Sequence, residues 1–383
     1  MTHDIPAARY GERLVAARTA LRERDVAALL VGVGPQLRWL TGYAAMPLER
    51  LTMLVLPTDG PITLVVPRLE RDPAERAPAS AAGLLEIATW GETDDATLVV
   101  AGAISPGAHN GRLLLSDDLW ALHTLRLQER FPAATFGLAT EALRDIRAVK
   151  DVDEIARLRA AGASADRVVE AVVGGRLVGR SEADVAREIR QRLIDGGHEQ
   201  ADFAIVGSGP NSASPHHEAS DRVIRAGEAL VLDLGGVRDG YCSDTTRTAW
   251  LTGGDPALGA TPEFRSLYHV LQQAQRAATD AVRPGVSCEA IDAAARTIIA
   301  AAGWGDRFLH RTGHGIGLEV HEEPYIVAGN AEPLRVGHAF SIEPGIYIEG
   351  RYGARIEDIV VCAAEGADAL NRTSRDLYEV AGI

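Results

Sequence analysis

The sequence predicts an α/β (α+β) chain of two domains, with an α/β domain over residues 1–147 followed by a domain of two similar halves over residues 148–383. Three observations support this prediction. The 383 residues exceed the usual span of one hydrophobic core. Strand-like and helical segments alternate along the first part of the chain, and two segments of the second part match each other at a constant offset.

The first domain is predicted element by element from hydrophobic periodicity. Residues 9–25 alternate between polar and apolar with a helical period, and a second helical pattern covers residues 119–129. Short apolar runs between them predict strands, two of which form a hairpin around Asp59-Gly60-Pro61. The expected strands are residues 27–33, 51–56, 62–66, 98–100 and 113–115. No cluster of catalytic residue types is found in this domain.

The second domain begins where Arg147-Ala148-Val149-Lys150-Asp151 introduces a long predicted helix, Val152 to Val173. Further along, residues 225–240 match residues 335–350 at a constant offset of 110, with an acid at the same place in each. Each segment follows a predicted helix that has a serine at its expected N-cap. These helices are 182–196 after Ser181 and 288–302 after Ser287. We therefore predict two halves, each a helix followed by a β-hairpin, related by a pseudo-twofold axis.

Composition excludes several classes of function. A net charge of −14 would repel phosphate backbones and anionic lipids, so neither nucleic acid nor a membrane is an expected partner. No apolar run approaches the roughly 20 residues that a membrane span needs, and no secretory signal pattern is found. Cys242, Cys288 and Cys362 are odd in number and widely spaced, which is typical of a reducing compartment. We expect a cytoplasmic protein.

Four acidic residues are placed where a charge should not be buried alone. Asp233 and Glu343 each end an apolar strand, and the returning strand of each hairpin carries a second acid, Asp244 or Glu357. Nearby arginines, Arg247 and Arg355, could neutralise these acids as ordinary ion pairs. Two equivalent hairpins that each offer an acid pair agree better with divalent metal ions.

A histidine in a glycine-rich stretch completes this hypothesis. His314 lies in Arg311-Thr312-Gly313-His314-Gly315-Ile316-Gly317, where glycine allows the backbone to approach closely. Oxygen-rich ligation with one imidazole suits Mn²⁺ or Co²⁺, and Zn²⁺ less obviously. Two such ions could support a hydroxide nucleophile. His321 and one of His216 and His217 are further candidates, since adjacent side chains in an extended segment diverge.

Three segments resemble the pita-bread metallopeptidases, which comprise Xaa-Pro dipeptidase (prolidase), aminopeptidase P, methionine aminopeptidase and the metal-free creatinase. The segments are Ser208-Gly209-Pro210-Asn211, His310 to Pro324, and Ser341-Ile342-Glu343-Pro344-Gly345. The chain is most similar to bacterial Xaa-Pro dipeptidases. The resemblance implies a creatinase-like N-terminal domain over 1–147, a pita-bread catalytic domain over 148–383, and a homodimer.

The resemblance also implies residue roles. The family's five ligands to two divalent ions, Mn²⁺ first with Co²⁺ or Zn²⁺ as alternatives, fall on Asp233, Asp244, His314, Glu343 and Glu357. A hydroxide bridging the two ions would attack the scissile carbonyl, and Glu343 would transfer its proton to the leaving nitrogen. His216 and His321 match substrate-side histidines that stabilise the reacting group, and Arg355 matches an arginine that orients the carboxylates.

One departure concerns the substrate carboxylate. One branch of prolidases has an arginine that binds it just after the His-Glu-x-Pro segment, where this chain has Tyr325. Arg50 of the N-terminal domain is a candidate replacement, although arginine at such a position is also common on a solvated surface.

The predicted function is metal-dependent hydrolysis of the peptide bond preceding proline, with an Xaa-Pro dipeptide as substrate. The first alternative is aminopeptidase P activity on longer Xaa-Pro peptides. Creatinase-like hydrolysis of a small non-peptide amide is a second, and a non-catalytic binding module on the same fold is a third. All five ligand positions are intact, which argues against the last two.

Overall fold

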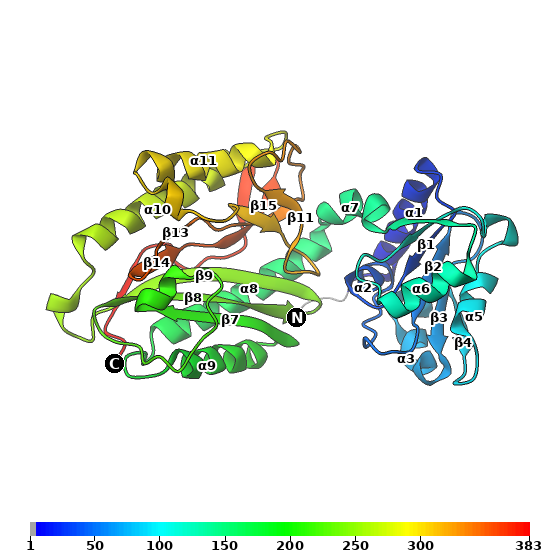
Figure 1. Ribbon diagram of the computed structural model, residues 1–383, viewed down its shortest axis with the longest axis horizontal. Coiled ribbons are helices and arrows are strands. Elements are labelled where there is room, and N and C mark those ends of the chain that lie inside the picture. Colours follow the sequence, from blue (N-terminus) through cyan, green and yellow to red (C-terminus); the bar gives the residue numbers. More distant parts are fainter. Residues whose placement is uncertain (1–4) are drawn as a thin grey trace. The chain divides into compact units, whose positions relative to one another are not determined.

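The computed structural model describes residues 5–383 as two compact units (Figure 1). The N-terminal unit ends at Arg147, and the C-terminal unit runs from Ala148 to Ile383. Within the described residues, no helix is both long enough and apolar enough to cross a bilayer.

The N-terminal unit is built on a mixed six-stranded sheet with the order β4-β3-β2-β1-β5-β6. Strands β1 and β2 and strands β2 and β3 pair antiparallel, and the other neighbours pair parallel. Strands β1 to β3 are buried along their whole length, so both faces of the sheet are covered. The strands are β1 (Ala28–Val31), β2 (Met53–Pro57), β3 (Thr63–Pro67), β4 (Glu86–Trp90), β5 (Arg112–Leu115) and β6 (Thr135–Leu138).

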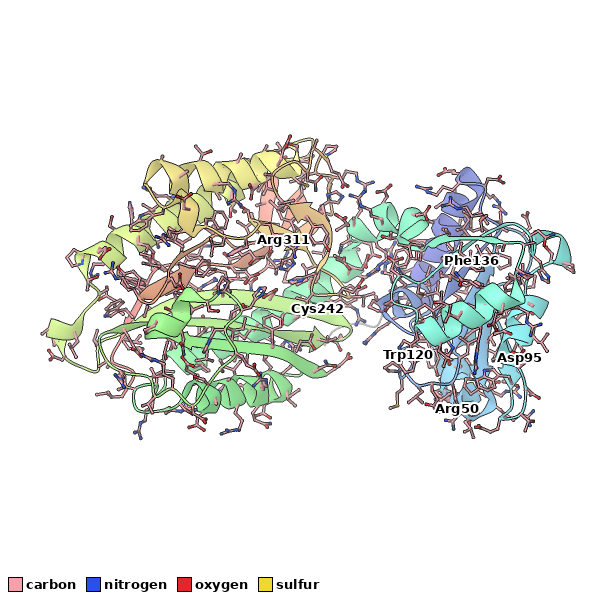
Figure 2. The ribbon with its side chains drawn as sticks, in the orientation of Figure 1. Arg50, Asp95, Trp120, Phe136, Cys242 and Arg311 are labelled. Atoms are coloured by element: carbon pink, nitrogen blue, oxygen red, sulfur yellow. The ribbon has the colours of Figure 1, made fainter. Side chains whose placement is uncertain are left out.

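Helices α5 and α6 pack against one face of this sheet through Val100 and Leu127, and Ile104 and Phe131, which follow these helices, join the same core. The half-buried Phe136 of β6, labelled in Figure 2, packs against it. The helices of the unit are α1 (Ala7–Glu23), α2 (Pro35–Thr41), α3 (Arg71–Arg76), α4 (Pro78–Ala81), α5 (Ala96–Gly102), α6 (Ala121–Arg130) and α7 (Thr140–Ala148).

The strand predicted at residues 98–100 is wrong, because these residues lie inside α5. Asp95 caps the helix by accepting a hydrogen bond from the Thr97 amide at 2.9 Å. The β-branched pair Val99-Val100 favours a strand by propensity, but packing of Val100 into the core decides for helix.

The first half of the C-terminal unit is a sheet with the order β17-β9-β8-β7, against which helices α8 and α9 pack. Strands β8 and β9 form one continuous antiparallel hairpin of 11 residues on each side. The elements are α8 (Val152–Val173), α9 (Glu182–Asp195), β7 (Gln200–Ser208), β8 (Glu228–Arg238), β9 (Tyr241–Leu251) and β17 (Tyr378–Val380).

The second half packs helices α10 and α11 against a five-stranded sheet with the order β11-β10-β12-β15-β16 and a hairpin of β13 and β14. Figure 1 shows the strands of this unit between the pair α10 and α11 and the pair α8 and α9. The elements are α10 (Pro262–Ala281), α11 (Cys288–Ala301), β10 (Gly313–Gly315), β11 (Glu322–Ile326), β12 (Ala339–Ile342), β13 (Gly345–Ile348), β14 (Tyr352–Arg355), β15 (Asp358–Ala363) and β16 (Gly366–Ala369).

The two halves differ in two details. The second hairpin is interrupted on one side at Glu343-Pro344, between β12 and β13, and on the other at Ile356-Glu357, between β14 and β15. Ser181 caps α9 through a hydrogen bond from the Asp184 amide, whereas the Ser287 hydroxyl accepts no capping hydrogen bond at the start of α11. Acidic residues therefore occupy a regular hairpin in one half and strand breaks in the other.

Candidate metal centre

The β8–β9 hairpin places two acids on one face of the sheet. Asp233 of β8 lies opposite Thr246, and Asp244 of β9 lies opposite Gly235, two residues further along β8. Residues two apart on a strand share a face, so both carboxylates point to the same side. Both side chains are buried.

The strand breaks of the second half bring Glu343 and Glu357 to the same place. Glu357 forms an isolated antiparallel bridge with Thr246, the residue opposite Asp233. The Thr246 hydroxyl donates a hydrogen bond of 2.7 Å to Glu357 Oε2, which fixes this carboxylate. The bridge between Thr246 and Glu357 therefore brings carboxylates of the two halves together.

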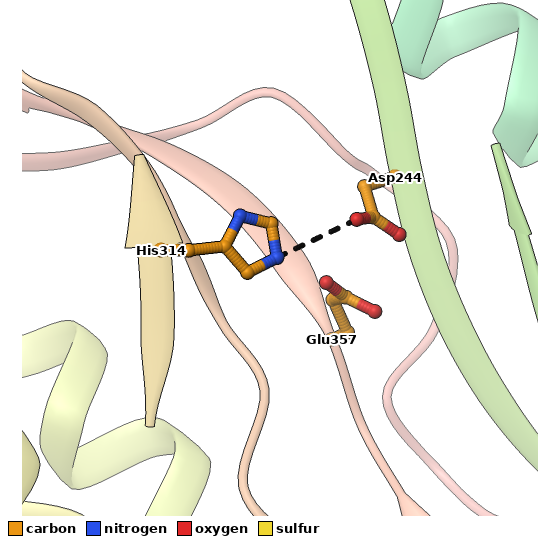
Figure 3. Close-up of side chains that lie close together, drawn as sticks. All are labelled: Asp244, His314 and Glu357. Carbon is orange, nitrogen blue, oxygen red and sulfur yellow. Dashed lines mark ion pairs between the residues drawn. The ribbon is translucent and has the colours of Figure 1, made fainter. Parts of the chain in front are cut away.

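His314 lies on the short strand β10 with its imidazole facing the acids (Figure 3). Its Nε2 is 3.2 Å from Glu343 Oε1 and 3.6 Å from Asp244 Oδ2. Its Nδ1 lies 3.1 Å from the Gly315 carbonyl, an arrangement that turns Nε2 toward the acids, where a metal ion could bind. A Cβ on either flanking glycine would lie within 2.5 Å of a backbone oxygen, so this close approach requires glycine.

Ligand atoms from Asp244, His314 and Glu357 all lie within 4.8 Å of one another, a spacing that could hold a metal ion. Asp233 and Glu343 extend this group. Asp233 Oδ1 is buried and accepts no hydrogen bond from any described residue. A buried carboxylate oxygen without a donor is costly, and a cation would remove that cost. The residues present therefore fit a divalent ion.

The pKa values of the acidic residues also favour a bound cation. Burial raises the pKa of Asp244 well above its usual range, and the neighbouring Glu357 raises it further. Burial likewise raises the pKa of Glu357, with Glu343 and Asp233 adding to the effect. Burial also opposes the charge on Glu343, but the hydrogen bond and charge of His314, together with the charges of His310 and Arg355, outweigh it and lower the pKa to about 2. The acids lack positive charge, and bound cations would supply it.

Arginine neutralises only one of the four acids. Arg355 forms a short ion pair with Asp233, and its Nε donates to the Thr246 hydroxyl at 3.0 Å. Arg247, the other arginine close by in sequence, is fully buried and pairs instead with Asp358 at 2.7 Å. An ion-pair interpretation therefore accounts for Asp233 and leaves Asp244, Glu343 and Glu357 without an arginine.

A pocket of about 440 Å³ opens over this cluster and contains the predicted substrate-side residues. All five predicted ligands line it, together with His216, His321 and Arg355. His217 turns away and lies with its Nε2 2.8 Å from Glu182. Arg50 belongs to the N-terminal unit, where its Nε is 3.2 Å from Glu92.

Several pocket residues were not singled out from the sequence. His310 lies with its Nε2 2.9 Å from the Tyr347 hydroxyl, which also accepts a hydrogen bond of 2.9 Å from Arg355. Burial lowers the pKa of the His310 imidazole, which favours its neutral form. The spacing of His310, four residues before His314, is the one sequence signal that could have identified it. The remaining lining residues are Phe203, Ile205, Pro215, Arg311 and Val320.

Comparisons with known proteins identify the family of this arrangement. Residues 156–364 match the model of metallopeptidase family M24, and residues 13–149 match the creatinase/prolidase N-terminal domain. The chain belongs to metallopeptidase family M24. This confirms the predicted family and fold class, in which a creatinase-like domain precedes a catalytic domain.

Relatives of this M24 chain match it over nearly its full length. It is 45% identical over 372 residues to the "Probable dipeptidase PepE" of Mycobacterium tuberculosis, covering 97% of this chain and 96% of the relative. The dipeptidase PepE structure from Mycobacterium ulcerans is 46% identical with a TM-score of 0.90, covering 99% of this chain and 100% of that one. A prolidase structure from Thermococcus sibiricus is 34% identical with a TM-score of 0.88, covering 97% and 99%. The chain is thus a metallo-exopeptidase.

Proposed function

We propose that this M24 enzyme hydrolyses the peptide bond preceding proline, with Xaa-Pro dipeptides as its substrates. The observation that carries the proposal is the pocket in which four carboxylates and the His314 imidazole converge. The resemblance to dipeptidases and prolidases over nearly the whole chain supports this choice of substrate.

We assign two divalent ions to this pocket, with Mn²⁺ as the first candidate and Co²⁺ or Zn²⁺ as alternatives. Asp233 would hold one ion, His314 and Glu343 the other, and Asp244 and Glu357 both. When bound, the ions would supply an activated water and polarise the scissile carbonyl. The unpartnered Asp233 Oδ1 and the raised pKa values of Asp244 and Glu357 support this assignment.

Side chains of the pocket would carry out the proton transfers and orient the reacting groups. Glu343 lines the pocket and would take a proton and release it to the leaving nitrogen. That nitrogen carries no hydrogen in an Xaa-Pro bond, so it must gain a proton to depart as an amine. His216 and His321 line the same pocket and would donate hydrogen bonds to the reacting carbonyl oxygen or the departing group. Arg355 orients Asp233 and, through Thr246, Glu357.

A second candidate is Xaa-Pro aminopeptidase activity on longer peptides. The X-Pro aminopeptidase structure from Thermotoga maritima is 26% identical to this chain with a TM-score of 0.80, covering 97% of this chain and 99% of that one. The two activities differ only in whether the chain continues beyond proline. Substrate length therefore separates them.

The test measures proline release from Ala-Pro and cleavage of Ala-Pro-Ala, with Ala-Ala as the control. The protein is first stripped of metal with a chelator, and Mn²⁺, Co²⁺ or Zn²⁺ is then added back. We expect metal to restore cleavage of Ala-Pro alone. Cleavage mainly of Ala-Pro-Ala would move the assignment to aminopeptidase P. Failure to cleave any of the three with metal bound would reject both peptidase assignments.

We also propose that the protein is a cytoplasmic homodimer. The resemblance to pita-bread peptidases supports the dimer, and three widely spaced, buried cysteines are compatible with a reducing compartment. Light scattering during size exclusion would give the mass directly, against 40.7 kDa for one chain. A monomeric mass would reject the dimer.

A further inference from the structure

Arg311 places a positive charge in the pocket, and no carboxylate among residues 5–383 forms an ion pair with it. Its side chain lines the pocket and is half-buried, and Figure 2 labels it in the C-terminal unit. Its guanidinium forms no ion pair with any of residues 5–383. Such a group favours an anion that enters from outside.

The position of the Arg311 guanidinium is fixed by Tyr325. The guanidinium carbon lies 4.4 Å from the centroid of the Tyr325 ring, a cation–π contact. This stacking occupies the face of the planar guanidinium and leaves its N–H groups free along the edges. Those edges can donate two parallel hydrogen bonds to a carboxylate.

Tyr325 in turn brings Arg311 close to the metal centre. Across the β10–β11 pair, Tyr325 is directly opposite His314, so their side chains emerge on one face of the sheet. The imidazole of His321, whose centroid is 4.1 Å from that of His314, lies beside them. The guanidinium thus lies beside the histidines of the reaction site, and the Glu343 carboxylate contacts His314 rather than Arg311.

Resting on the proposed function, we propose that Arg311, stacked on Tyr325, binds the C-terminal carboxylate of an Xaa-Pro dipeptide and thereby selects dipeptides over longer peptides. In such a substrate three bonds separate the scissile carbonyl carbon from the carboxylate carbon, a reach of at most about 4 Å. The carboxylate must therefore be bound beside the reacting groups. In a tripeptide the same position holds a neutral amide, which cannot form a charged pair.

Arg50, the other candidate for this role, has an acidic partner of its own. Its guanidinium is paired with Glu92 inside the N-terminal unit. Binding a substrate carboxylate there would first require that pair to break. Binding of a carboxylate by Arg311 requires no such ion pair to break.

The experiment compares Ala-Pro with Ala-Pro amide, which has the same shape and no negative charge. Arg311→Met keeps the length of the side chain and removes the charge. We expect kcat/KM for Ala-Pro to fall about 10- to 100-fold, the usual worth of a hydrogen-bonded charge pair. For the amide, kcat/KM should change by less than about 3-fold, because the lost interaction is absent there. Arg311→Lys should give an intermediate loss, since it retains the charge without the planar fork.

Arg307→Met is the matched control, because Arg307 is exposed and lies four residues before Arg311. This variant should leave kcat/KM for both substrates unchanged. Thermal unfolding of each variant separates loss of folding from loss of recognition. Equal losses on Ala-Pro and its amide in Arg311→Met, or a loss selective for Ala-Pro in Arg50→Met alone, would overturn the inference.

A binding measurement separates this inference from the proposed function. Calorimetric titration of metal-depleted protein with both compounds measures carboxylate recognition without turnover. A preference for Ala-Pro that disappears in Arg311→Met supports the anchor even where the loaded enzyme cleaves neither compound, in which case the peptidase proposal alone fails. Metal-dependent cleavage of Ala-Pro, with no Arg311-dependent preference in binding or rate, keeps the peptidase and rejects the anchor.

Discussion

Asp244 is the residue that most directly tests the metal hypothesis, because it lies in the tightest part of the cluster. We expect Asp244→Asn to abolish metal uptake while the fold is retained. Burial and Glu357 already favour the uncharged form of this carboxyl in the absence of metal, and asparagine has nearly the shape of that form. A neutral amide is a far weaker ligand for a hard cation than a carboxylate.

The measurement is the metal content per chain after equilibrium dialysis against Mn²⁺. Asp221→Asn serves as the control, since Asp221 is exposed and lies outside the cluster. It should bind as much metal as the unmodified protein. Two ions retained by Asp244→Asn would show that the four acids are not ligands.

The candidate ligands could be predicted from sequence because their pattern is local. An acid at the end of an apolar strand can be recognised without knowing what it meets. Arg311 and Tyr347 could not be predicted in this way, since their roles depend on contacts between distant parts of the chain. Tyr347 contacts His310 across 37 residues, and the cation–π contact of Arg311 depends on how β10 pairs with β11. The sequence pattern determines neither of these contacts.

At the scale of elements, the loop after β7 is held by one buried carboxylate. Glu182, at the start of α9, accepts hydrogen bonds from the amides and hydroxyls of Ser208 and Ser220 and from the Asn211 side chain. It also contacts His217 at 2.8 Å. Because His216 immediately precedes His217 in this loop, Glu182 helps to position the segment that carries a pocket residue.

These contacts predict a pH-dependent contribution to stability. Burial opposes the charge on Glu182, but the hydrogen bonds from Ser220, Ser208 and His217 outweigh it and lower the pKa from 4.5 to about 2. A depressed pKa stabilises the fold fully above the unfolded value, and this stabilisation is lost as pH falls through the folded value. The shift corresponds to about 3 kcal/mol in the free energy of unfolding.

We therefore expect Glu182→Gln to destabilise the C-terminal unit by about 2 to 3 kcal/mol at pH 7, and by less at pH 3. Denaturant unfolding at both values would measure this difference. Glu289→Gln is the control, because Glu289 is exposed in the first turn of α11, in the other half of the same unit. A loss of stability that is the same at both pH values would contradict the assignment of the effect to ionised Glu182.

Most elements agree with periodicity, and the exceptions have physical causes. The helix predicted over Val152 to Val173 matches α8, since the capping box of Asp151 and Glu154 marks its start. The strand predicted at 98–100 is wrong because packing on the sheet outweighs the strand propensity of valine. The break of the second hairpin at Glu343-Pro344 is a consequence of proline, which cannot donate a ladder hydrogen bond.

At the scale of the whole molecule, the metal centre joins the two halves of the C-terminal unit. Asp233 and Asp244 come from the β8–β9 hairpin, whereas His314, Glu343 and Glu357 come from the second half. Within residues 5–383, the only group of side chains with metal-ligand spacing lies in this unit. Bound ions would connect the halves in the folded state, and unfolding would separate their ligands.

Metal should therefore raise the thermal stability of this unit alone. A ligand that binds only the folded state at 100 times its dissociation constant adds about 2.7 kcal/mol per site. For a unit of this size, two such sites correspond to an increase of about 10 to 20 °C in the unfolding midpoint. Differential scanning calorimetry in the presence of a chelator or of excess Mn²⁺ would measure the change.

The N-terminal unit provides an internal control, because it contributes no residue to the cluster and its own transition should not move. Asp244→Asn should remove the increase, since Asp244 is assigned to both ions. An equal shift of both transitions would indicate a nonspecific effect of the salt, because carboxylates outside the cluster are distributed over both units. A midpoint that does not respond to metal would mean that the acids are stabilised by protons and by Arg355 alone, and the proposed hydrolytic mechanism would then lose its nucleophile.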